Sequence, residues 1–225
     1  MKKFTKTEVD QLALLLTYSS CKIENNTFTY QETKNLLEHN ILPDTYKDTR
    51  EVYELINFKN VVLYIVENYA NLDISIDTIR SIHKIIMENI LTNNGVFRNH
   101  NVRINNSRTI PYDYSVINYK LEKLNNSFKE EIKNKNKNEI YDEVLKYHCY
   151  FEKIHPFSDG NGRVGRALLF LMQLKYDLEL NYIDPEFKIE YFDGIDHFLL
   201  TGDISKLRTN IKKSKIKVAK NVNTL

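Results

Sequence analysis

Residues that interrupt helices are scarce in this chain. Its six glycines and four prolines occupy 10 of 225 positions, about 4%, where average usage gives about 12%. All-β folds with many tight turns and collagen-like chains need these residues in quantity. Their scarcity therefore argues against such folds and favours long helices. A chain of this length can bury roughly 70% of its unfolded surface, enough for one large domain.

Apolar residues recur at helical spacing along most of the sequence. One helix is expected to begin at the capping box formed by Thr29 and Glu32. We see no internal repeat and no linker rich in Gly, Pro or Ser, so we expect one domain over residues 1–225. The predicted helices cover residues 6–23, 29–40, 48–71, 77–91, a stretch from about 114, and 139–153, 162–176, 187–200 and 203–215.

The helical spacing breaks at Gly95, and short runs rich in β-branched residues follow. Separated by the polar residues 105–108, these runs predict a short two-stranded hairpin. The predicted fold class is therefore all-α, a helical bundle with one short β-hairpin. The predicted strand residues are Val102, Arg103 and Ile104 on one side and Thr109 and Ile110 on the other.

The charge balance and the two cysteines exclude several classes of protein. The 32 Lys and Arg nearly cancel the 30 Asp and Glu, for a net charge of +2, which argues against a strongly basic nucleic-acid binder. Cys21 and Cys149 cannot build a disulfide framework. No apolar run approaches the roughly 18 residues of a membrane span, and no signal peptide is apparent. We expect a cytoplasmic protein that binds neither nucleic acid nor membrane, with a frayed basic tail over residues 214–225.

Three of the six glycines lie in one segment, HPFSDGNGRVGR, at residues 155–166. A loop of small residues that opens a helix presents backbone N–H groups beside the positive end of the helix dipole, which favours anions. Arg163 and Arg166 share a helical face and suit phosphate oxygens. Asp159 offers a hard oxygen ligand for Mg²⁺. His155 can accept a proton near neutral pH.

This segment resembles the Fic family signature, H-P-F-x-[DE]-G-N-G-R-x-x-R, and matches it at every defined position. We take the resemblance to extend over residues 5–210, with the Fic core at about residues 48–210. It implies an all-helical fold with a β-hairpin called the flap, which docks a target segment by adding a strand. It also implies the activity of most characterised members, the transfer of AMP from ATP to a protein hydroxyl.

The resemblance assigns a role to each defined position. His155 would be the general base for the Ser, Thr or Tyr hydroxyl of the target. Asp159 would hold Mg²⁺, which bridges the α- and β-phosphates. The Doc branch has lysine in place of Gly162 and acts as a kinase, so glycine favours nucleotidyl transfer. The residues that would bind the nucleotide phosphates are Gly160, Asn161, Gly162, Arg163 and Arg166, the last at the γ-phosphate.

A second segment near the N-terminus resembles the Fic inhibitory motif, [ST]-x-x-x-E-[GN]. Ser20, Glu24 and Asn25 stand at its defined positions, and Ser20 and Glu24 share a helical face. The resemblance implies that Glu24 pairs with Arg166 and occupies the place that the γ-phosphate needs. It places the chain in the subclass with an N-terminal inhibitory helix, here about residues 6–24. Asn25 suits a left-handed helix end.

Three functions stay open at this stage. The favoured one is an Mg²⁺-dependent protein adenylyltransferase that uses ATP, is inhibited through Glu24, and modifies a protein of unknown identity, with self-modification left open. The second is a hydrolase that removes AMP by aligning a water with the same glutamate. The third is a non-enzymatic module that binds a partner through the hairpin, against which the intact His155 and Asp159 argue. The nucleotide base and a homodimer are left open.

Other polar residues receive structural roles. We expect His83 to be packed among its apolar neighbours, and Glu54 and Asn57 to serve structure only. His148 and Cys149 have no metal-ligand partners at a suitable spacing.

Overall fold

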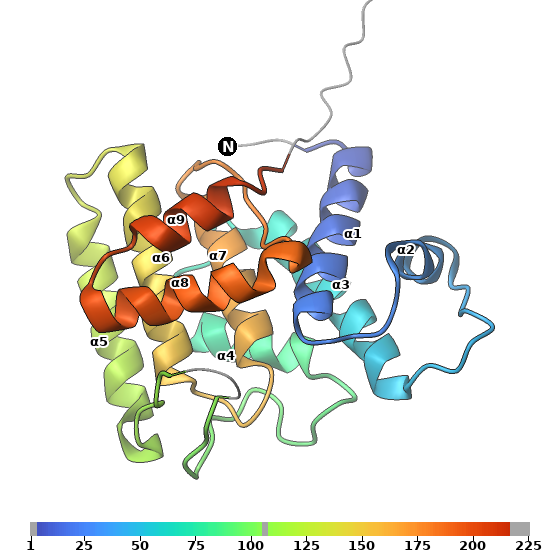
Figure 1. The fold of residues 1–225 in the computed structure, drawn as a ribbon, viewed down its shortest axis with the longest axis horizontal. Coiled ribbons are helices and arrows are strands. Elements are labelled where there is room, and N and C mark those ends of the chain that lie inside the picture. Colours follow the sequence, from blue (N-terminus) through green and yellow to red (C-terminus); the bar gives the residue numbers. More distant parts are fainter. Residues whose placement is uncertain (1–3, 105–107, 217–225) are drawn as a thin grey trace, which may run out of the picture.

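The computed structural model describes residues 4–104 and 108–216. In these residues the chain forms nine α-helices and two short 3₁₀ helices (Figure 1). The predicted all-α fold is confirmed. The α-helices are α1 (Lys6–Ile23), α2 (Tyr30–His39), α3 (Thr49–Asn68), α4 (Ile76–Ile86), α5 (Ile117–Glu131), α6 (Lys137–Ile154), α7 (Asn161–Lys175), α8 (Lys188–Thr201) and α9 (Ser205–Lys212). The 3₁₀ helices are η1 (Tyr114–Val116) and η2 (Pro185–Phe187).

Local sequence signals set several helix ends. Three helices begin at a reciprocal capping box, in which the cap side chain accepts the third N–H and a glutamate accepts the cap N–H. The box predicted at the start of α2 is one of them, and that helix ends at Asn40 in the left-handed conformation, with φ at 57°. The three pairs are Thr5 with Glu8, Thr29 with Glu32, and Asn136 with Glu139.

Helix α7 runs through the centre of the bundle and contacts α1, α3, α4 and α6 (Figure 1). Almost all of its residues are buried, from Asn161 to Leu174. A helix that is buried on every face can be apolar all round, as this one is from Ala167 to Met172, before the buried Gln173. Its N-terminal turn therefore holds residues 161–166 in fixed positions relative to the surrounding helices.

The N-terminal helix α1 lies along α3 and also contacts α7. Residues of its last turns are buried against these helices, among them Cys21 and Ile23. Asn26 continues this contact, because its side-chain amide donates to the Glu54 carboxylate at 3.2 Å. The turn that follows α1 is thereby fixed to α3.

The predicted β-hairpin does not form in the described residues. No strand occurs in its two arms, and residues 105–107 of its predicted turn lie outside the described residues. The Arg108 N–H and the Thr109 hydroxyl instead donate to the Asp196 carboxylate of α8, at 3.0 and 2.7 Å. The start of the second arm is thus bound to a helix side chain. The residues that were predicted as strands and have no strand structure are Val102, Arg103, Ile104, Thr109 and Ile110.

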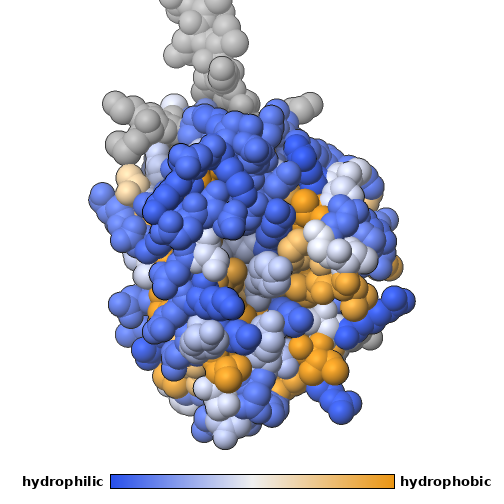
Figure 2. All heavy atoms as spheres, turned by 90° about the vertical axis from the view of Figure 1, so that its left-hand side faces the viewer, coloured by the Kyte–Doolittle hydropathy of each residue, from blue (hydrophilic) through white to orange (hydrophobic). Residues whose placement is uncertain are grey.

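The surface that α5 contributes to is largely hydrophilic, and apolar residues appear on it as separate patches (Figure 2). Within the described ranges, no helix combines the length and the apolar character needed to cross a bilayer. The predicted basic tail lies outside the described residues from residue 217 onward.

Candidate functional site

Residues 155–160 form a tight loop between α6 and α7. His155 ends α6 with φ at 49°, and Gly160 precedes α7 with φ at 79°. Glycine adopts this second conformation without strain, and a Cβ at Gly160 would lie only 2.8 Å from the Met87 Sδ. The two left-handed residues turn the chain sharply between the end of α6 and the start of α7.

The loop is held closed by one asparagine. The Asn161 side chain accepts the Phe157 N–H and donates to the Phe157 carbonyl oxygen, both at 2.8 Å. The Phe157 ring is buried and stacks on His83, with centroids 3.6 Å apart and planes 5° from parallel. The Asn161 amide is therefore used inside the loop, so any contact of this residue with an anion falls to its backbone N–H.

His83 fixes the backbone of Asp159. The Gly95 N–H donates to His83 Nδ1 at 2.7 Å, which places the imidazole hydrogen on Nε2. That hydrogen is donated to the Asp159 carbonyl oxygen at 3.1 Å. Burial lowers the pKa of His83 to about 4, so the ring stays neutral. The side chain is packed, as predicted, and it also orients the loop.

Arg98 belongs to no sequence motif, yet it joins the end of α6, where the loop begins, to the segment between α4 and α5. Its buried guanidinium donates to the carbonyl oxygens of His155, His100 and Tyr112 at 2.8, 2.7 and 2.5 Å. A fourth bond reaches the Ile154 carbonyl at 3.3 Å. Carbonyls at a helix C-terminus lack intrahelical partners. At the end of α6, Arg98 donates hydrogen bonds to two of them, those of Ile154 and His155.

Arg98→Lys is expected to lower the free energy of unfolding by about 2–4 kcal/mol, because one ammonium cannot replace a fork that bonds four carbonyls. Urea denaturation followed by circular dichroism measures this. Arg103→Lys, at an exposed arginine of the same segment, serves as the control. If Arg98→Lys loses no more stability than the control, the guanidinium does not hold the loop.

The His155 ring is positioned as a neutral base. Its Nδ1 lies 3.3 Å from the Glu152 carbonyl oxygen, which can only accept, so we assign the hydrogen to Nδ1. Nε2 is then the atom that can take up a proton. Burial lowers the pKa of His155 to about 4, and 18% of the side chain remains exposed. The ring is thus neutral at physiological pH and reachable from solvent.

Asp159 lies within a group of charges from α3 and α7. Its Oδ1 accepts the Gly160 N–H at 2.6 Å and lies 3.5 Å from Arg163 Nη2. Its Oδ2 contacts Arg50 of α3. Glu54 completes the group, with Oε1 at 3.1 Å from both Arg50 Nε and Arg163 Nη1. Burial would raise the pKa of Asp159, but the charges of Arg163 and Arg50 outweigh it and lower the pKa, so the carboxylate is ionised.

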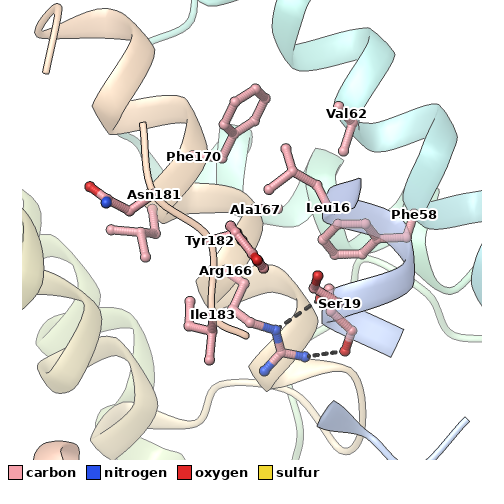
Figure 3. Close-up of a pocket in the computed structure, with 12 residues that line it drawn as sticks. Leu16, Ser19, Phe58, Val62, Arg166, Ala167, Phe170, Asn181, Tyr182 and Ile183 are labelled. Atoms are coloured by element: carbon pink, nitrogen blue, oxygen red, sulfur yellow. Dashed lines mark hydrogen bonds between the residues drawn. The ribbon is translucent and has the colours of Figure 1, made fainter. Parts of the chain in front are cut away.

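Arg166 joins the two motifs that the sequence analysis singled out (Figure 3). It reaches from α7 to α1, where Nε donates to the Ser20 hydroxyl at 2.8 Å and Nη2 to the Ser20 carbonyl at 3.0 Å. Nη2 also donates to the Glu24 carboxylate at 2.6 Å. Burial opposes ionisation of Glu24, and Arg166 nevertheless lowers its pKa. The predicted pair of Glu24 and Arg166 is present.

Asn25 shapes the turn that carries Glu24. It adopts the left-handed conformation, with φ at 69°, as expected for that position. Its side-chain oxygen accepts a hydrogen bond from Lys188 at the start of α8, at 2.7 Å. The turn is therefore fixed from two sides, by α7 and by α8.

Gly162 lies directly beside the pair of Glu24 and Arg166. A Cβ at this position would be 2.5 Å from Glu24 Oε1 and 3.0 Å from Arg166 Nη1. Glycine therefore leaves space for charged groups at the first turn of α7, where Gly160 provides no side-chain cap to the helix N–H groups. A cavity of about 20 Å³ next to Arg166 (Figure 3) has room for about one water molecule.

A family model described as the Fic/DOC family matches residues 73–173, which contain the whole loop. This part of the chain is similar to the Fic/DOC family. A relative from Aedes aegypti named protein adenylyltransferase Fic is 27% identical over 184 residues, covering 78% of this chain and 35% of the relative. The chain thus spans about a third of the length of that protein.

Solved Fic structures share the fold. Fic-1 from C. elegans (residues 134–508, E274G) superposes with a TM-score of 0.79 at 22% identity, covering 91% of this chain and 60% of that one. A Fic domain containing signaling protein from Bacteroides thetaiotaomicron also gives a TM-score of 0.79, at 18% identity, with 92% and 84% covered. At these identities the likeness concerns the fold.

Buried polar groups pack against the first two turns of α7. The His148 Nδ1–H donates to the Gly165 carbonyl at 3.1 Å, and the Tyr191 hydroxyl donates to His148 Nε2 at 2.7 Å. Burial lowers the pKa of His148 to about 3 and raises that of Glu152 to about 7. Glu152 Oε1 is buried without a hydrogen-bond partner among the described residues. A Cβ on Gly165 would clash with that oxygen, which explains the third glycine of the segment.

These buried groups predict acid sensitivity of the fold. His83, His148 and His155 have lowered pKa values in the folded state, so between about pH 6.5 and 4 each takes up a proton on unfolding. Glu152, with its raised pKa, releases one between about pH 7 and 4.5. The unfolded state therefore binds about two more protons, and stability should fall by on the order of 2 kcal/mol per pH unit as pH drops from 6 to 5.

Urea midpoints measured at pH 7, 6 and 5 test this expectation. Glu152→Gln removes the opposing carboxyl and should steepen the loss. Equal free energies of unfolding at pH 6 and pH 5 would show that the three imidazoles are not held neutral.

Proposed function

We propose that this chain is an Mg²⁺-dependent protein adenylyltransferase that transfers AMP from ATP to a Ser, Thr or Tyr hydroxyl of a protein. The observation that carries the proposal is the neutral His155 at the start of the loop that leads into the uncapped N-terminus of α7, with Arg163 and Arg166 on that helix. The curated Fic relative named protein adenylyltransferase supports this activity. Self-modification belongs to the same proposal, since the chain carries 15 tyrosines.

The phosphates of ATP would bind at the first turn of α7. The N–H groups of Asn161 and Gly162 and the flexibility of Gly160 suit an anion at a helix N-terminus. Buried donors on two arginines support this proposal: Arg163 Nε and Arg166 Nη1 have no hydrogen-bond partner in the described part of the chain. Unmet donors of this kind call for a ligand, because leaving them unpaired is costly.

His155 would act as the general base. Its Nε2 takes the proton from the target hydroxyl, the oxygen forms a bond to the α-phosphorus, and the bond from that phosphorus to the bridging oxygen breaks. Pyrophosphate leaves, and the imidazolium returns its proton to solvent. A base with a lowered pKa remains neutral, and so competent, throughout the physiological range.

Asp159 would hold the Mg²⁺. The described residues contain no cluster of three or more His, Cys, Asp or Glu side chains that could bind a metal by themselves. Mg²⁺ is commonly bound by one or two carboxylates together with substrate phosphates. Asp159 fits that role because its Oδ2 already contacts a cation, the guanidinium of Arg50. When bound, the metal would neutralise charge on the phosphates.

Glu24 would inhibit the enzyme by occupying Arg166. The Nε and Nη2 groups of this guanidinium bond Ser20 and Glu24 at the end of α1, so they cannot also orient the γ-phosphate of ATP, and Nη1 alone is left for it. We therefore propose that the chain belongs to the subclass with an N-terminal inhibitory helix, formed by α1. Release would require the turn at Asn25 to move away from α7.

Mass spectrometry of proteins incubated with ATP, Mg²⁺ and the Glu24→Gly variant tests the proposed function. Addition of AMP to Ser, Thr or Tyr supports it, and transfer of another nucleotide in parallel reactions would redefine the base preference. Complete absence of nucleotidylated protein, including the enzyme itself, would overturn it.

Removal of AMP is a second candidate, favoured by one observation. Glu24 is ionised and 35% exposed, so its carboxylate could align a water beside the loop. Incubating an AMP-modified protein with the enzyme and Mg²⁺ distinguishes the two: release of AMP that is lost in Glu24→Gly indicates the hydrolase.

A further inference from the structure

We propose that Arg50 is the resident counter-ion of Asp159 and competes with the divalent cation for this carboxylate, so that metal binding requires the Arg50 guanidinium to leave. The inference rests on the proposed function, since it concerns the metal ligand of that reaction. It assigns a role to a residue outside the Fic loop, in the first turn of α3.

The contacts define the competition. Arg50 Nη2 contacts Asp159 Oδ2, while Asp159 Oδ1 accepts the Gly160 N–H. Both carboxylate oxygens thus have partners, and Oδ2 is paired with the positive charge of Arg50. A metal ion at Asp159 Oδ2 would replace this guanidinium, because two cations cannot share the same oxygen at contact distance without strong repulsion.

Exposure decides which cation can leave. Two arginines contact Asp159, but the side chain of Arg163 is 2% exposed and that of Arg50 is 47% exposed. Arg163 is fixed within α7, whereas Arg50 can turn into solvent, where its charge is hydrated at little cost. An exposed ion pair of this kind contributes only about 0–1 kcal/mol. A doubly charged ion that is also bound by phosphates can therefore displace it.

The remaining charges stay balanced after the exchange. Glu54 Oε1 lies 3.1 Å from Arg50 Nε and also 3.1 Å from Arg163 Nη1. When Arg50 leaves, Arg163 still neutralises the buried Glu54. Only the Arg50 side chain needs to move, and α3 keeps its place.

Mn²⁺ binding measured by electron paramagnetic resonance tests the inference without relying on turnover. The protein is the full chain with Glu24→Gly, saturated with the non-hydrolysable analogue AMPPNP, with and without Arg50→Gln. Removing a competing pair worth up to about 1 kcal/mol should lower the Kd for Mn²⁺ by up to about fivefold. Arg50→Lys, which keeps the charge, should lower it less.

Matched variants separate this effect from a general change in charge. Arg208→Gln removes an arginine of similar exposure, 34%, that pairs with Asp142 at 3.0 Å, and should leave the Kd for Mn²⁺ unchanged. Asp159→Asn should abolish the binding. High salt should reduce the difference that Arg50→Gln makes.

The outcomes distinguish the two proposals. If Glu24→Gly binds Mn²⁺ with AMPPNP and Arg50→Gln leaves the Kd unchanged or raises it, the competition is wrong while the nucleotide site stands. If Glu24→Gly binds no Mn²⁺ with AMPPNP at all, the proposed function fails, and the inference on Arg50 falls with it.

Discussion

Glu24→Gly is expected to raise the rate of AMP transfer to protein by roughly tenfold or more, since an ion-pair competition worth about 1.4 kcal/mol corresponds to a factor of ten. In the wild type, the Glu24 carboxylate lies 2.6 Å from Arg166 Nη2. Under the proposed mechanism, the substitution would free that guanidinium to bind the γ-phosphate of ATP. It also opens space beside Gly162, which the Glu24 carboxylate crowds in the wild type. Labelling of proteins with α-labelled ATP measures the change.

Two further variants make this result specific. Glu24→Gln keeps the shape of the side chain and removes its charge, so it should activate less than glycine but more than wild type. Glu67→Gly removes an exposed carboxylate near the end of α3 and should leave labelling unchanged. Equal labelling by the wild type and Glu24→Gly would eliminate Glu24 as an inhibitor. The buried Arg166 loses a partner in the variant, so some loss of thermal stability is also expected.

Features encoded by short stretches of sequence were predictable. The capping box at Thr29, the left-handed Asn25 and the glycine-rich start of α7 each depend on a few consecutive residues. The pairing of Glu24 with Arg166 spans 142 residues and was available only because two family motifs implied it. No periodicity in the sequence could have brought these two residues together.

Features set by distant partners were missed or predicted wrongly. The β-branched residues on either side of residues 105–108 indicated two strands, but Asp196, 88 residues from Arg108, accepts hydrogen bonds from Arg108 and Thr109. Arg98 lies in a stretch without periodicity, and its partners in α6 are more than 50 residues away. Such contacts follow from tertiary packing, which overrides local β-propensity.

Asn161 and Glu54 show how a residue's role can differ from its assignment. Asn161 matched a motif position expected to bind phosphate, yet its amide bonds both backbone groups of Phe157. A short polar side chain just after a turn commonly pairs with nearby backbone in this way. Glu54 received a structural role from sequence, and the structure places its carboxylate against Arg163 and Arg50. Buried charges need partners, and here the partners are residues of the site.

His155→Ala, made in the Glu24→Gly background, is expected to reduce AMP transfer by about 10²–10⁴-fold, the usual contribution of a general base. The ring sits at the end of α6 with Nδ1 directed to the Glu152 carbonyl, so Nε2 alone is available for the hydroxyl proton. Alanine removes that acceptor and leaves the contacts of Arg98 to the backbone carbonyls in place. Transfer is measured with α-labelled ATP, and nucleotide binding by calorimetry.

The binding measurement decides how a loss of activity is interpreted. His155→Ala should bind AMPPNP with Mg²⁺ as tightly as the parent, because the proposed phosphate contacts come from α7 and its arginines rather than from this imidazole. His39→Ala, at an exposed histidine of α2, should affect neither quantity. Since the pKa of His155 is lowered to about 4, the transfer rate of the parent should stay the same from pH 8 to pH 6, where an imidazole with the usual pKa of 6.5 would lose most of its neutral form. Transfer by His155→Ala at the parental rate would exclude this imidazole as the base and require another acceptor for the hydroxyl proton.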